Sequence, residues 1–244
     1  MIKKNHKKSE YLKDDNMLHQ LQKLFTYLTY TSYGEVIPKD LAFSIKNYEG
    51  QPINTNEMQY SDEFYFNFCD NIEESLKKTK YEYLIKNLFI GKLCHKNFCT
   101  SCKNITYRLE DFKYITLDVK DLNNIYESLD NYISEDNIED YPCSNCGKKI
   151  TLKKCSLISS LPNILIIHLN RIIINTEYGN QQKINSRFEF PKELDLKKYC
   201  LENNIGEAEK KINAESIYKK KDEYYKYTLK GVNIHKGNAE GGHY

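Results

Sequence analysis

The order of apolar and polar residues predicts helices in the first part of the chain. Between residues 16 and 31 apolar residues recur every three or four positions, the stripe of an amphipathic helix, and Asn16 is placed to cap its N-terminus. A second stripe predicts a helix that runs to the lysines near Lys78. Its apolar members are Phe64, Phe68, Ile72 and Leu76. Residues 1–88 are therefore expected to be helical.

From about residue 88 onward the pattern is that of β-strands. Residues 115–119 alternate between apolar and polar, which predicts a strand buried on one face. A short helix is expected over 121–133, and an acidic, turn-rich stretch over 134–142. Residues 161–174, LPNILIIHLNRIII, are almost continuously apolar, which predicts a central strand covered on both sides.

The last part of the chain alternates between charged and strand-like segments. Residues 201–223 are rich in lysine, glutamate and asparagine, which predicts a solvated insertion. Residues 224–237, YYKYTLKGVNIHKG, resume the strand pattern. Helices followed by a run of strands indicate the α+β fold class.

Two cysteine pairs point to a metal site. Cys99 and Cys102, and likewise Cys143 and Cys146, are separated by two residues, so both sulfurs of a pair can reach one ion at about 2.3 Å. Gly147 suits the tight turn after the second pair. Four thiolates in a tetrahedron are the usual ligands of structural zinc and leave no open position for an activating water. We therefore predict one structural zinc ion per chain.

Two alternatives remain open for these cysteines. Cys94 and His95 lie close enough in sequence to replace a ligand, and one pair could instead hold no metal and be merely buried. The 40 residues between the pairs exceed the spacing of a compact zinc finger, so the ion is expected to pin the tip of a long β-structure.

Charge and composition exclude several function classes. The chain has 36 Lys+Arg against 34 Asp+Glu, and only three of the basic residues are arginine, which argues against a nucleic-acid partner. No stretch approaches the ~20 apolar residues that cross a bilayer, and the N-terminus lacks the apolar core of a signal peptide. We expect an intracellular protein, cytoplasmic and/or nuclear, without a membrane partner.

Several segments in the same order resemble ubiquitin-specific proteases, the thiol-dependent ubiquitin carboxyl-terminal hydrolases. The details are most similar to the large fat-facets-type subgroup, and the resemblance extends from about residue 17 to the end of the chain. The segments are GKLCHKNFCTSCKNITYRLEDFKYITLDV, YPCSNCGKKITLKKCSLISSLPNILIIHLNR, RFEFPKELDLKKYC and YTLKGVNIHKGNAEGGHY, together with the helix that contains Glu63, Phe64 and Tyr65.

This resemblance implies a papain-like cysteine protease fold with a thumb, a palm and zinc-tipped fingers. It implies a thumb over 1–88, fingers over 89–157, and a palm over 158–244 with a charged insertion at about 201–223. The implied activity is hydrolysis of the isopeptide bond after the C-terminal glycine of ubiquitin. Ubiquitin and ubiquitinated proteins are the implied partners, with the Gly-Gly tail of ubiquitin threaded between thumb and palm.

The resemblance also assigns site residues. His243 matches the catalytic base, which takes the thiol proton and returns it to the leaving amine; the alternative is a surface histidine near a frayed end. Gly241 and Gly242 would let the backbone approach the substrate tail, and His235 matches a structural or substrate-facing strand residue. His168 is expected to be a hydrogen-bonded core histidine.

Two catalytic parts of the family have no counterpart in the sequence. The nucleophile box Asn-x-x-x-x-Cys-Tyr-x-Asn-Ser does not precede Met17, and the Asp or Asn that orients the histidine would follow Tyr244. We expect the first thumb helix and the nucleophile to be missing and the chain to be inactive by itself. Cys69, Cys155 and Cys200 are expected to be buried or incidental thiols. The alternatives are a catalytically dead ubiquitin-binding pseudoenzyme and, less favoured, a zinc-ribbon protein that binds nucleic acid.

Overall fold

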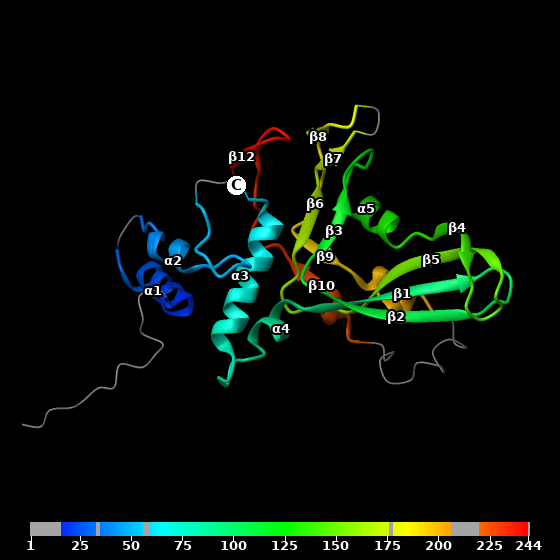
Figure 1. Cartoon of the computed structure of the whole chain (residues 1–244), viewed down its shortest axis with the longest axis horizontal. Coiled ribbons are helices and arrows are strands. Elements are labelled where there is room, and N and C mark those ends of the chain that lie inside the picture. The colour runs from blue at the N-terminus through cyan, green and yellow to red at the C-terminus, as the bar shows by residue number, and fades with distance from the viewer. Residues whose placement is uncertain (1–15, 33–34, 56–58, 176–177, 206–219, 244) are drawn as a thin grey trace, which may run out of the picture. The chain divides into compact units, whose positions relative to one another are not determined.

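The structure is a computed structural model that describes residues 16–32, 35–55, 59–175, 178–205 and 220–243 (Figure 1). The chain forms two compact units, one of the residues up to Lys86 together with His243, and one from Asn87 to Gly242. Among the described residues, no helix combines the length and the apolar character that crossing a bilayer requires.

The first unit is helical, as predicted. Asn16 caps its first helix by accepting a hydrogen bond from the His19 backbone N–H at 3.0 Å, which confirms the expected N-cap. Asn71 exchanges two hydrogen bonds with the backbone of Lys46 and so ties the loop after the second helix to the third. The helices are α1 (Met17–Tyr30), α2 (Lys39–Ser44) and α3 (Ser61–Leu76), followed by α4 (Leu84–Phe89).

The apolar stripe of α1 is only partly covered. Met17 is buried, but Phe25 and Leu28 are 58% and 62% exposed. The stripe is therefore covered at the N-terminal end of the helix and exposed in its C-terminal half. Helical spacing determines which residues share a face, whereas burial depends on what lies opposite that face.

The second unit contains an antiparallel four-stranded sheet in the order β2-β1-β5-β4, which extends away from the other strands of the unit (Figure 1). The strands are β1 (Gly91–Cys99), β2 (Ile105–Phe112), β4 (Asp136–Pro142) and β5 (Lys149–Ser160). Strand β4 corrects the expectation of turns over 134–142. It is an exposed edge strand with a bulge between Ile138 and Tyr141, where Asp140 takes a φ of 54°.

The core of this unit is built on a parallel pair of short strands and one helix. In β3 (Ile115–Asp118) the predicted alternation is confirmed, because Ile115 and Leu117 are 1% and 0% exposed while their neighbours are exposed. Strand β3 pairs with β6 (Ile167–Asn170). Helix α5 (Ile125–Tyr132) begins later than expected, because Asp121 takes a φ of 59° and Asn124 caps the helix.

The predicted central strand over 161–174 is wrong in two respects. It divides into β6 and β7 (Ile172–Ile174), and all residues of β6 are only half-buried. Strand β7 pairs instead with β8 (Gln181–Lys183), so its last residue, Ile174, is 68% exposed. A run of apolar residues cannot show where a chain leaves one sheet for another.

The region of the expected charged insertion begins with buried residues, whereas residues 220–223 at its other end are exposed, as expected. Leu201 and Glu202 are each 5% exposed, and Glu202 accepts a hydrogen bond from the hydroxyl of the buried Tyr225 at 2.7 Å. Residues 206–219 lie outside the described residues. The remaining elements are β9 (Glu193–Asp195), η2 (Lys197–Tyr199), η3 (Leu201–Asn203), η4 (Asp222–Tyr225), β10 (Lys226–Thr228), β11 (Lys236–Gly237) and β12 (Gly242–His243).

Candidate functional site

Four cysteine side chains gather at the far end of the four-stranded sheet. Strands β1 and β5 are antiparallel neighbours, so the turn after β1 and the turn before β5 lie at the same end (Figure 1). The sulfurs of Cys99, Cys102, Cys143 and Cys146 all lie within 4.8 Å of one another. The structure thus brings together the two pairs that the sequence separates by 40 residues.

The two turns repeat one backbone arrangement. The Lys103 N–H donates to the Cys99 carbonyl at 3.0 Å, and the Gly147 N–H donates to the Cys143 carbonyl at 2.8 Å. Lys103 and Gly147 take φ angles of 61° and 66°, in the left-handed region. The glycine expected after the second pair is confirmed in this role, and a lysine performs it in the first turn.

Because the left-handed position is a glycine in one turn and a lysine in the other, substitutions at the two positions should change stability in opposite directions. Gly147→Ala is expected to lower the free energy of unfolding by about 1 kcal/mol, because an L-residue is disfavoured in the left-handed region. Lys103→Gly is expected to raise it by less than about 1 kcal/mol, since relief of the same strain is partly offset by greater freedom of the unfolded chain. Urea unfolding of the two variants tests this, and equal stability would contradict it.

Hydrogen bonds favour the thiolate form of two of these cysteines. The Asn145 side-chain amide donates to the Cys102 sulfur at 3.3 Å and, with further hydrogen bonds from the Asn104 backbone and Cys99, lowers the pKa of Cys102 to about 6. Backbone N–H groups of Cys146 and Asn145 lower the pKa of Cys143. The pKa of Cys146 is instead raised, by burial and by its contacts with the other three sulfurs. Because a metal binds thiolates and not thiols, Cys102 and Cys143 are the members best prepared for a metal.

The alternative ligands do not belong to the cluster. Cys94 is 1% exposed and packs in a separate apolar cluster with Leu157 and Leu201. The ring Nδ1 of His95 lies 2.8 Å from the Ser156 hydroxyl, on the neighbouring strand. The donor set is therefore four soft sulfurs, which suits zinc better than a hard cation.

A second group of predicted site residues forms a tight hairpin between β11 and β12. The Asn238 side-chain oxygen accepts hydrogen bonds from the backbone N–H groups of Glu240 and Gly241 at 3.0 and 2.9 Å. A Cβ on Gly242 would lie 2.3 Å from the Nε2 of His235 and 2.5 Å from the backbone oxygen of Lys236, so only glycine fits between these strands. The hairpin places His235, Gly241, Gly242 and the exposed His243 together.

Other residues singled out in the sequence have ordinary packing roles. His168 is half-buried in β6 and meets the Tyr114 ring edge-on, with the ring centroids 5.8 Å apart. Cys69 and Cys200 are buried, as expected, and Cys155 is half-buried. Burial raises the pKa of Cys200 and raises that of Cys94 to about 11.

One residue of this region has no signal in the sequence. Lys183, at the end of β8, donates hydrogen bonds to the backbone carbonyls of His235 and Gly237 at 3.0 and 2.8 Å. A lysine among 36 basic residues is not conspicuous in the sequence, and only the fold brings it to the hairpin.

Comparison with known proteins finds one family that matches the whole chain. The family model described as ubiquitin carboxyl-terminal hydrolase matches residues 1–244. Ubiquitin carboxyl-terminal hydrolase 34 of Homo sapiens is 34% identical over 245 residues, which cover 98% of this chain and 7% of that protein. The probable ubiquitin carboxyl-terminal hydrolase FAF of Drosophila melanogaster is 27% identical over 231 residues, which cover 93% of this chain and 8% of that protein. The chain thus spans less than a tenth of the length of these two relatives.

A solved structure shares the fold. The SAGA Ubp8/Sgf11/Sus1/Sgf73 DUB module bound to ubiquitin aldehyde contains a chain that matches with a TM-score of 0.74 and 24% identity. The match covers 96% of this chain and 52% of that one. The α+β fold expected from the sequence is thereby confirmed.

Proposed function

The chain belongs to the ubiquitin carboxyl-terminal hydrolase family, and we propose that it forms the fingers, the palm and the catalytic base of a cysteine-type deubiquitinase. The reaction is thiol-dependent hydrolysis of the isopeptide bond after the C-terminal glycine of ubiquitin. The observation that carries this proposal is the family match over all 244 residues. In this assignment residues 1–88 are the thumb, 89–157 the fingers and 158–244 the palm.

The hairpin supports a role for His243 as the base. A neutral imidazole can take the proton of a thiol and return it to the leaving lysine amine. Gly241 and Gly242 precede it without side chains, which would let an extended glycine tail lie against the backbone. His235, packed against Gly242, would shape the same surface.

None of the four cysteines outside the metal cluster has the surroundings of an activated nucleophile. The other four belong to the cluster. Cys94 and Cys200 have raised pKa values, Cys69 is 2% exposed in α3, and Cys155 is half-buried in β5. A catalytic thiol instead needs an accessible site and a lowered pKa. Residues 1–244 alone are therefore proposed to bind ubiquitin without cleaving it.

Zinc is proposed to occupy the four-cysteine cluster. One ion would be held by Cys99, Cys102, Cys143 and Cys146 and would clamp the two turns at the tip of the sheet. Its closed shell of four protein ligands supplies cross-linking and no activated water. The metal would therefore stabilise the fingers and take no part in hydrolysis.

Ubiquitin and ubiquitinated proteins are the proposed partners, in the cytoplasm and/or the nucleus. The matched structure of the DUB module was solved with ubiquitin aldehyde, which supports ubiquitin as a ligand here. The net charge of +2 and the scarcity of arginine favour no nucleic-acid partner, and no membrane partner is proposed.

Binding and labelling of the 244-residue chain test this proposal. We expect saturable one-to-one binding of monoubiquitin by calorimetry, and no covalent adduct with a ubiquitin electrophile. Absence of binding would contradict the function, and an adduct would reveal a nucleophile among the eight cysteines. A salt-sensitive complex with random duplex DNA would favour the zinc-ribbon alternative. Turnover by the complete product of the gene separates an enzyme from a pseudoenzyme.

A further inference from the structure

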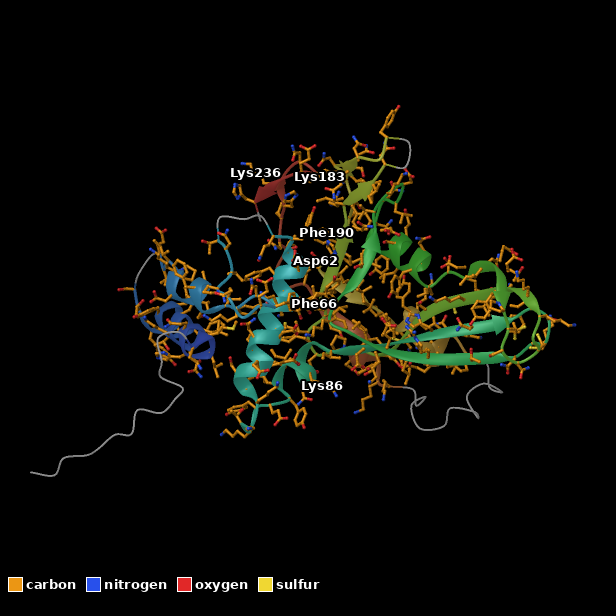
Figure 2. All side chains as sticks on the ribbon, viewed as in Figure 1. Asp62, Phe66, Lys86, Lys183, Phe190 and Lys236 are labelled. Carbon is orange, nitrogen blue, oxygen red and sulfur yellow. The ribbon has the colours of Figure 1, made fainter. Side chains whose placement is uncertain are left out.

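We propose that Lys183 is a positioning residue that holds the hairpin carrying His243 in place. Its Nζ bridges the carbonyl oxygens of His235 and Gly237, at 3.0 and 2.8 Å. In Figure 2, Lys183 lies beside the strand that contains Lys236, the residue between those two carbonyls. The side chain of Lys183 thus joins β8 to β11, two segments more than 50 residues apart in sequence.

The two carbonyls lie on the side of β11 that β12 does not use. In an extended strand, carbonyls two residues apart point to the same side and the one between them points to the other. The Lys236 carbonyl lies toward Gly242, 2.5 Å from where a Cβ of that glycine would stand. The carbonyls of His235 and Gly237 therefore point away from β12, and the ammonium group satisfies both, as a neighbouring strand would.

The backbone around Lys183 is itself held by strand pairing and by hydrogen bonds. Strand β8 pairs with β7, where Ile172 is opposite Lys183. Arg171 then fastens the segment that follows, since its guanidinium donates to the carbonyls of Ile184 and Ser186 at 3.0 Å each. The ammonium group is consequently presented from a strand whose own position is set by independent hydrogen bonds.

The consequence for chemistry rests on the proposed function. The hairpin from His235 to His243 is closed internally by Asn238, so it can move as one piece. Lys183 would determine the position of the hairpin. It would thereby also set the positions of the glycines that meet the substrate tail and of the His243 imidazole. Lys183 touches neither the reacting atoms nor the tail and acts only through the hairpin.

The test compares Lys183→Met and Lys183→Arg with a matched control, Lys120→Met, in the 244-residue chain. Lys120 is exposed after β3, and the described structure gives it no hydrogen bond or ion pair. In K183M, amide hydrogen exchange in residues 235–243 should be roughly 10- to 100-fold faster, because two charge-assisted hydrogen bonds are lost. In K183R it should stay within about 3-fold of the parent, because a guanidinium fork can reach both carbonyls.

A second measurement separates positioning from general stability. Ubiquitin should lose about 10-fold in affinity for K183M, whereas ubiquitin without its last two glycines should bind the parent and K183M equally. K120M should change neither quantity. If K183M does not fold, Lys183→Gln, which retains one short donor, replaces it in both measurements.

Three outcomes would be informative. Unchanged exchange in the hairpin of K183M would overturn the proposal, and so would an equal loss of affinity for intact and shortened ubiquitin. If the parent chain does not bind ubiquitin at all, the proposed function fails, while the exchange rates still decide whether Lys183 holds the hairpin.

Discussion

Replacing Cys143 by serine is expected to release the metal and unfold the end of the four-stranded sheet that carries the four cysteines. A serine hydroxyl stays protonated at neutral pH and is a poor zinc ligand, so three thiolates would remain where four are needed to close the shell. Structural zinc contributes about 10–16 kcal/mol of apparent binding energy in small zinc domains, so most of the metal's contribution to the stability of this end of the sheet would be lost. Elemental analysis should find one zinc per parent chain and none in the variant.

The loss of structure in Cys143→Ser should be confined to the end of the sheet that carries the cysteines. Amide exchange should accelerate in β4 and in the two cysteine turns, because these contain the ligands or lie beside them, whereas β3 and α5 belong to a separate apolar core. Cys155→Ser is the matched control, since Cys155 is half-buried in the same sheet but outside the cluster. Retained zinc in Cys143→Ser, or zinc loss in the control, would show that the ligands are assigned wrongly.

Gly91→Ala is expected to destabilise the root of the same sheet. Gly91 begins β1 opposite Phe112, and an added Cβ would stand 2.3 Å from the Phe112 ring and 2.8 Å from the backbone oxygen of Ser160. The ring can shift, but the Ser160 carbonyl belongs to β5 and cannot move without disturbing the sheet. We expect the free energy of unfolding to fall by about 2–3 kcal/mol and the melting temperature by about 5–10 °C.

Gly231→Ala is the control for replacing a glycine by alanine where no steric clash results. A Cβ at Gly231 would meet nothing within 4 Å, so this variant should stay within about 0.5 kcal/mol of the parent. Thermal and urea unfolding of both variants give the comparison. Equal stabilities would mean that the backbone around Gly91 relaxes without cost.

Much of this protein could be predicted from residues close together in the sequence. The cap of α1 by Asn16, the alternation in β3 and the turn at Gly147 are local, since each depends on side chains and backbone within a few positions. The cysteine pairs are local as well, because a gap of two residues already fits a metal knuckle. The family resemblance rests on such segments in their order, and it is confirmed over the whole chain.

The predictions that failed concern burial and pairing. Residues 161–174 are almost continuously apolar, but β6 is only half-buried and Ile174 is 68% exposed. Residues 134–142 carry turn-forming residues, yet they pair with β5 as an edge strand. Both outcomes depend on which segment the fold places opposite these residues, and local propensity does not encode that.

The sequence by itself therefore determined the family, the helical and strand-forming regions and the four candidate metal ligands. Only the tertiary structure decided that the two cysteine pairs meet at one point while Cys94 and His95 stay outside, because antiparallel pairing of β1 with β5 brings their turns to one end of the sheet. It likewise decided that Lys183 reaches the hairpin of His243. Hydrogen bonds between distant segments form only where the fold has already placed them, and their distances cannot be read from spacing along the chain.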